Sequence, residues 1–230
     1  MAEGVTVKPR SVELIKDEEK KISFYQTYLD NLAQGDSVSS EIFRNKGEAH
    51  ASILMATLLA NTVESLKLYC RGLTPGILCG KNEKDGTGFE GAYWFEFKRF
   101  FDNTIKSVRF QNNSVQILIQ EDAYLDNQPF LKVKQALQDP ETKNKIKVKR
   151  ITPDLKKEID SFLGNSKGEN YNFAIFDGRA FRLEYNPDTY QAIGSFRSLS
   201  WCNLLGALFD KAFKQAEEIP ELFRAKDKID

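Results

Sequence analysis

Apolar and polar positions along the chain predict helices and strands that alternate. Apolar residues recur at helical spacing in six stretches, residues 11–32, 41–65, 91–105, 129–137, 154–163 and 198–219. Short apolar runs typical of strands lie between them, at residues 66–70, 115–120 and 146–151. Alternation of this kind predicts an α/β fold, with a mixed, largely parallel sheet covered by helices on both faces.

The segment 170–197 interrupts the alternation, because its pattern predicts consecutive strands joined by tight turns. A short apolar run ends at Asp177-Gly178, a dipeptide typical of hairpin turns. After the turn, side chains alternate, and Arg182 and Glu184 fall on the face opposite the apolar ones. A second turn and a third short strand complete the segment.

This segment resembles the phospholipase D superfamily. Active members carry the pattern His-x-Lys-x4-Asp-Gly, which is followed by a Gly-Ser-x-Asn element. In this sequence Asp177-Gly178 fit the end of the first element. Gly194-Ser195 fit the start of the second, although the gap between the two elements is longer than usual. The resemblance implies a single phospholipase-D-like lobe.

The departures from the family pattern fall on the residues that perform the chemistry. Asn170 stands at the position of the His that forms the phosphoenzyme, and Asn172 at that of the Lys that holds the phosphate. Arg197 stands where Asn is usual. An amide cannot take up the proton or carry the phosphoryl group, because its nitrogen lone pair is delocalised. The resemblance therefore implies a pseudoenzyme that lacks the catalytic His and Lys.

The resemblance also suggests how the chain is divided. We expect an N-terminal helical extension at residues 1–40 and a phospholipase-D-like domain at residues 41–230. No internal repeat is found in the sequence, so the second lobe of two-lobe members is not expected. Single-lobe members dimerise across the face that holds the motif, so the resemblance implies a homodimer or another protein partner.

Composition narrows the class of protein. Hydrophobic residues make up 41% and charged residues 29% of the chain, as in ordinary soluble globular proteins. The formal net charge is zero, so no global field attracts nucleic acid or a membrane. With no apolar run long enough to span a bilayer and no signal-peptide pattern, we expect a cytoplasmic protein. Cys70, Cys79 and Cys202 lack metal-ligand spacing and are expected to be reduced thiols.

Two groups of side chains around the motif are candidates for binding or chemistry. Arg182, Glu184 and Arg197 could form a remodelled anion site, with Glu184 or Asp177 as acid or base. The alternative is a turn Asp beside a cross-strand ion pair on a sheet edge. The degenerate motif positions could line a pocket that binds without turnover; they are Asn170, Asn172, Asp177 and Ser195.

Other polar residues have a plainer interpretation. His50 is the one histidine of the chain, and its place in an apolar predicted helix favours a structural role. One His and scattered carboxylates predict no metal site, and no cofactor is expected. A local basic run is typical either of a solvated strand face or of a nucleic-acid contact. Its members are Lys143, Lys145, Lys147, Lys149 and Arg150.

The interpretation that follows is a catalytically inactive phospholipase-D-like protein that acts as an interaction or regulatory subunit. By analogy, small degenerate members resemble accessory proteins of bacterial multi-gene systems, including anti-phage defence. One alternative is a diverged phosphodiesterase or nuclease that uses Asp177, Arg182 and Glu184, with His50 as a further candidate. The other is a nucleic-acid-binding module without chemistry. Whether the chain is an enzyme stays open, with the pseudoenzyme favoured.

Overall fold

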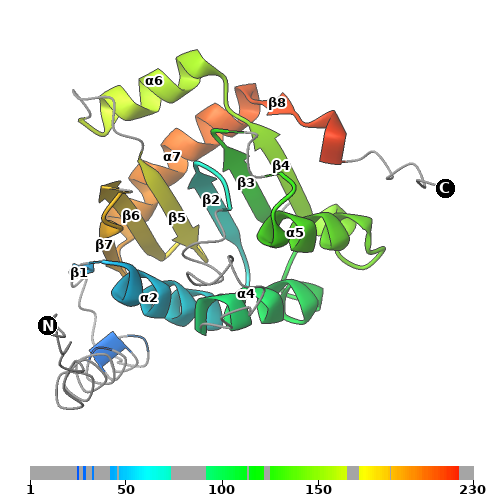
Figure 1. Cartoon of the computed structure of the whole chain (residues 1–230), viewed down its shortest axis with the longest axis horizontal. Coiled ribbons are helices and arrows are strands. Elements are labelled where there is room, and N and C mark those ends of the chain that lie inside the picture. The colour runs from blue at the N-terminus through cyan, green and yellow to red at the C-terminus, as the bar shows by residue number, and fades with distance from the viewer. Residues whose placement is uncertain are drawn as a thin grey trace, which may run out of the picture.

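The structure is a computed structural model of the chain, shown in Figure 1. It describes residues 25, 28–29, 33, 42–45, 47–73, 92–112, 114–121, 125–164, 171–186 and 188–222. Two residues singled out above, Asn170 and Cys79, lie outside this part of the chain.

One sheet of eight strands forms the centre of the described structure. Its strands are β1 (Phe43–Asn45), β2 (Leu66–Cys70), β3 (Val115–Ile119), β4 (Ile146–Arg150), β5 (Asn172–Phe176), β6 (Ala180–Asn186), β7 (Gln191–Ser195) and β8 (Glu217–Glu218). They lie in the order β1-β7-β6-β5-β2-β3-β4-β8. The pairs β2–β3 and β3–β4 are parallel, and the other neighbouring pairs are antiparallel.

The mixed α/β sheet is confirmed, but its pairing differs from the largely parallel arrangement that we expected. Two hairpins, β5–β6 and β6–β7, impose antiparallel pairing because a short turn reverses the chain. β5 also runs antiparallel to β2, so it continues the sheet beyond the parallel strands β2, β3 and β4 but points the other way. The short edge strands β1 and β8 lie within the stretches 41–65 and 198–219, and the prediction of helix is wrong there, since two or three residues show no measurable alternation.

Helices cover both faces of this sheet, as expected (Figure 1). α2, α4 and α5 pack on one face, and α6 and α7 on the other. Their bounds are Glu48–Ala60 for α2, Ala92–Asp102 for α4, Gln128–Gln138 for α5, Pro153–Phe162 for α6 and Leu199–Gln215 for α7. Among the helices that the structure describes, none has both the length and the apolar character needed to cross a membrane.

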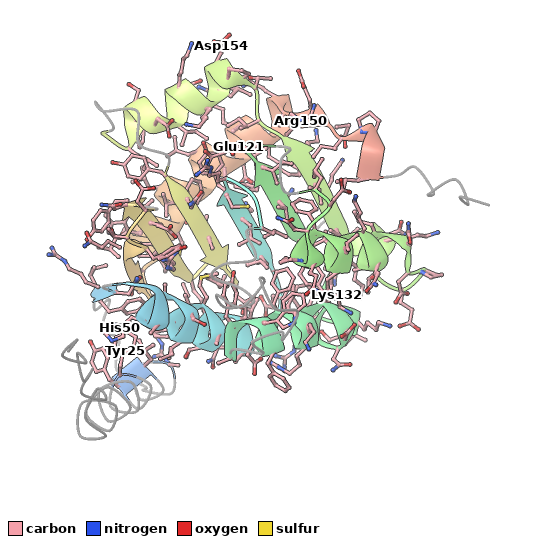
Figure 2. The ribbon with its side chains drawn as sticks, in the orientation of Figure 1. Tyr25, His50, Glu121, Lys132, Arg150 and Asp154 are labelled. Carbon is pink, nitrogen blue, oxygen red and sulfur yellow. The ribbon has the colours of Figure 1, made fainter. Side chains whose placement is uncertain are left out.

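The core between α2, α4 and the sheet includes a residue from the predicted N-terminal extension. α2 is apolar nearly all round, and Leu54 and Leu58 on it are almost fully buried. Leu29 is fully buried in the same apolar cluster. Tyr25 stacks on His50 of α2 with ring centroids 4.2 Å apart, and Figure 2 shows the two side by side. The described part of residues 1–40 therefore contributes to the main core.

Candidate functional site

The hairpin of β5 and β6 brings three of the candidate side chains to one face of the sheet. Asn172 pairs with Glu184 across the two strands, and Ala174 pairs with Arg182. Directly opposed residues on antiparallel strands project from the same face. Asn172, Arg182 and Glu184 therefore share the face that α2 and α4 cover, because Ala174 belongs to the apolar cluster on that side.

Arg182 and Glu184 form a buried ion pair. Arg182 Nη1 donates to Glu184 Oε2 over 2.6 Å, and each side chain is 7% exposed. Arg182 Nη2 also donates to the backbone carbonyl of Tyr190 over 3.3 Å. The expectation of a cross-strand pair on a sheet edge is wrong, since both residues lie on β6, between β5 and β7. The two side chains are buried because β6 is an internal strand and because α2 and α4 cover this face of the sheet.

A pocket of about 90 Å³ lies beside this ion pair. Its polar wall contains Asn172, Arg182 and Glu184, and the rest is largely apolar or aromatic. The wall also includes Cys70, at the end of β2, and Tyr190. This part of the sheet is therefore a small pocket that contains one buried positive charge and one buried negative charge, and the two pair with each other.

Asn172 is held in place by groups from the ends of β2 and β3. Its Oδ1 accepts from the backbone N–H of Arg71 over 2.8 Å, and Gln120 Nε2 lies 3.4 Å from the same oxygen. Gln120 Nε2 also donates to the carbonyl of Tyr171 over 2.8 Å. A backbone N–H can only donate, so this contact fixes which end of the Asn172 amide is the oxygen. Asn172 thus brings a neutral, oriented amide to the pocket.

Cys70 is a pocket residue that sequence reasoning missed, as is Tyr190. Burial, and secondly the negative charge of Glu184, raise the pKa of its thiol to about 12. The thiol is therefore protonated near neutral pH, whereas the thiolate is the nucleophilic form. The sequence offers no signal for this placement, because Cys70 has no characteristic spacing to another site residue.

Asp177 lies at the other end of β5 and serves the backbone. Its carboxylate accepts from the N–H groups of Val63, Glu64 and Ser65 over 3.0, 2.8 and 2.9 Å. Its φ of 52° and that of Gly178, 63°, are the left-handed values that a tight hairpin turn requires. This geometry gives Asp177 a structural role, in which it ties the motif hairpin to the loop after α2.

Ser195 and Arg197 do not line the pocket around Asn172. Ser195 is fully buried, and its Oγ accepts from the backbone N–H of Arg197 over 3.2 Å. Arg197 instead borders a separate cavity of about 40 Å³, together with Asp177 and Arg179. The structure therefore splits the predicted anion site, with Arg182 and Glu184 in one pocket and Arg197 beside another.

Gly194 of the motif is required by packing. A Cβ atom at this position would lie 2.6 Å from Phe43 and 2.7 Å from the carbonyl oxygen of Phe181. We expect Gly194→Ala to lower the free energy of unfolding by about 2 kcal/mol, because the ring and the strand must both shift. Urea denaturation measures this loss.

Gly206→Ala, on α7, is the matched control for that change. Its Cβ would meet only Ile175 Cδ1, at an ordinary 3.9 Å. Alanine favours a helix interior over glycine by about 1 kcal/mol, so this variant should be as stable as the wild type or more so. Equal stability of the two variants would contradict the packing argument for Gly194.

His50 lies on α2 and is not among the residues that line the pocket. Burial lowers its pKa, which favours the neutral imidazole that stacks on Tyr25. Within the described ranges, no group of three or more His, Cys, Asp or Glu side chains is placed to hold a metal ion.

The predicted basic run does not form one continuous cationic surface. Lys145 Nζ donates to the carbonyls of Ile105 and Ser107 over 2.9 and 3.0 Å. Lys149 pairs with Glu218 over 3.2 Å. At least two of the five cations are therefore engaged within the fold.

Comparison with known proteins finds distant structural likenesses. No family model and no curated protein matches the sequence. Among solved structures, the chain is similar to TrmBL2, an archaeal chromatin protein with a novel mode of DNA binding, at 12% identity and a TM-score of 0.46. That match covers 90% of this chain and 66% of TrmBL2.

Two bacterial proteins are similar to a comparable degree. One is Nuc from Salmonella typhimurium, a phospholipase D family member, with 12% identity and a TM-score of 0.43 over 78% of this chain and 99% of Nuc. The other is NucT from Helicobacter pylori, with 14% identity and a TM-score of 0.44 over 78% of this chain and 100% of NucT. At these values the likenesses assign no family.

Proposed function

We propose that the chain is a catalytically inactive phospholipase-D-like domain that acts as an interaction or regulatory subunit. The supporting observation is the buried ion pair of Arg182 and Glu184 in the pocket that Asn172 lines. The sequence motif is the reason for proposing a phospholipase-D-like domain, and the residues of the pocket are the reason for proposing that it is inactive. An accessory role in a bacterial anti-phage system remains a prediction by analogy.

Phosphodiester cleavage through a covalent intermediate needs a nucleophile and a cation that holds the phosphate. In the pocket, the Cys70 thiol is held protonated by its raised pKa, and Asn172 is a neutral amide. The positive charge of Arg182 is cancelled at 2.6 Å by Glu184. The described residues of the pocket thus lack both the nucleophile and the uncompensated cation.

The alternative of a diverged phosphodiesterase assigns an acid or base role to Glu184 or Asp177. Glu184 Oε2 is already bound to Arg182, and the Asp177 carboxylate is taken up by three backbone N–H groups. The two carboxylates also lie at opposite ends of the hairpin, since Glu184 pairs with Asn172 at the start of β5. They therefore do not form one acid–base pair around a shared substrate.

We expect no phosphodiester turnover above the buffer rate. The purified chain is incubated with single- and double-stranded DNA, with RNA and with bis(p-nitrophenyl) phosphate, each with and without divalent metal ions. Enzymes accelerate such reactions by about a millionfold or more, so even a poor catalyst would be detected. Turnover that Glu184→Gln removes, and that Lys157→Gln on the exposed face of α6 preserves, would refute the proposal.

The interaction role predicts that the chain does not act alone. Native mass measurement of the purified chain, and of the chain captured from its own host, should show a homodimer or a defined complex. The same measurement with DNA present addresses the nucleic-acid alternative, because phosphate contacts weaken steeply as salt is raised. A strictly monomeric chain without a copurifying partner would contradict the interaction role.

A further inference from the structure

We propose that the pocket beside Asn172 binds an uncharged carboxamide group and discriminates against anions. This inference rests on the proposed function, because it treats the pocket as a site that binds without turnover. It departs from phosphate recognition, the use that the sequence motif would suggest.

Charge balance at the pocket is the first reason. Arg182 is paired with Glu184 over 2.6 Å, and both are buried. Arg71, whose backbone N–H holds Asn172, is paired through its side chain with Glu121 over 2.7 Å. Figure 2 shows Glu121 at the end of β3. An entering anion would be attracted by one member of each pair and repelled by the other, so the described surroundings provide no net attraction.

Two hydrogen-bond donors without a described partner, one of them on the pocket wall, are the second reason. The Asn172 oxygen is engaged by Arg71, so its amide nitrogen is the part left for a ligand, and it donates to no described group. Arg182 Nε is buried and has no hydrogen-bond partner among the described residues. Buried donors are nearly always paired in native proteins. The Asn172 amide nitrogen calls for a hydrogen-bond acceptor on the ligand, and the buried Arg182 Nε is a second unpaired donor beside the pocket.

The acceptor on the wall is Glu184, and it completes the pattern. Its Oε2 binds Arg182, while its Oε1 accepts from no described group. A matching ligand therefore carries an acceptor next to a donor and has no net charge. A carboxamide has both on one carbon atom. The volume of about 90 Å³ suits a group of this size, since one water in the liquid occupies about 30 Å³.

Tyr190 keeps the arginine in position for such a ligand. Its φ of 56° is left-handed, which is unusual for a residue other than glycine and is typical of functional or tightly constrained positions. Its carbonyl accepts from Arg182 Nη2 and from the side chain of Asn45. With Nη1 bound to Glu184 and Nη2 bound to Tyr190, the guanidinium is held in a fixed orientation.

The test is a titration of the ¹⁵N-labelled full chain, followed by NMR, with three probes of similar size. Acetamide should shift the amide signals of residues that line the pocket, in a saturable manner. Acetate and inorganic phosphate should not shift the same signals. Absence of acetamide shifts, or equal binding of the anions, would overturn the inference.

Two variants test whether acetamide binds at the Asn172 side of the pocket. Asn172→Asp is isosteric and keeps an oxygen for the Arg71 N–H, but it replaces the amide donors with a charge. We expect it to weaken acetamide binding about tenfold or more, because one hydrogen bond is lost and a carboxylate takes the place of the amide donor. Asn203→Asp, on the exposed side of α7, should leave the affinity unchanged.

A double variant guards against a folding failure and separates the two hypotheses. Arg182→Met with Glu184→Leu removes both wall charges together, and such replacements of buried pairs are usually tolerated. It should fold and lose acetamide binding, and retained binding would overturn the inference. Phosphodiester turnover is measured independently: its presence would refute the proposed function, whereas absent acetamide shifts alone would refute only the ligand class.

Discussion

Arg182→Met is expected to lower the free energy of unfolding by about 3 to 5 kcal/mol. The change leaves the Glu184 carboxylate buried at 7% exposure without its 2.6 Å partner. It also removes a donor from the Tyr190 carbonyl, which is held in a left-handed backbone conformation. Urea denaturation measures the effect as a shift of the midpoint, provided that the slope with denaturant is unchanged.

Two further variants distinguish burial from the mere presence of an ion pair. Lys157→Met breaks the pair with Asp154, in which the side chains are 80% and 97% exposed, so its effect should stay within about 0.5 kcal/mol. Arg182→Met combined with Glu184→Leu should recover most of the loss, because no buried charge is left unpaired. If Arg182→Met destabilised the fold no more than Lys157→Met, the buried pair would not constrain the structure.

The sequence predicts the motif hairpin well because its signals are local. An apolar run followed by Asp177-Gly178 indicates a strand and a tight turn, and the turn has positive φ at both residues. The strands β3 and β4 and the helices α5 and α6 are predicted to within about two residues for the same reason: apolar periodicity, with proline near each helix start. These features depend only on neighbours along the chain.

Pairing direction and burial are not local, and there the prediction fails. The antiparallel pairing of β5 with β2 joins residues more than a hundred positions apart, such as Leu68 and Ala174. Alternation also places Arg182 and Glu184 on one face, but it cannot say that α2 and α4 cover that face. A polar pair in a strand is ordinarily solvated, so the buried pair contradicts the local pattern. Such conflicts are typical of functional sites.

Asp177→Ala is expected to lower the free energy of unfolding by about 3 kcal/mol, since hydrogen bonds to a charged group contribute about 1.5 to 3 kcal/mol each and water replaces part of them here. Three backbone N–H groups, from Val63 to Ser65, lose their common acceptor. Alanine must also adopt the φ of 52° that aspartate tolerates better. Thermal or urea denaturation measures the loss.

Further substitutions at and near this turn separate the lost acceptor from backbone strain. Asp177→Gly accepts the left-handed φ without strain but has no carboxylate, so it should stay close to the Ala variant if the acceptor dominates. Asp177→Asn keeps one oxygen and should lose less. Asp188→Ala, at an exposed aspartate of the next turn, should be nearly neutral. Should Asp177→Gly prove as stable as the wild type, Asp177 would matter only for turn conformation, and its contact with the loop after α2 would contribute nothing to the stability of the fold.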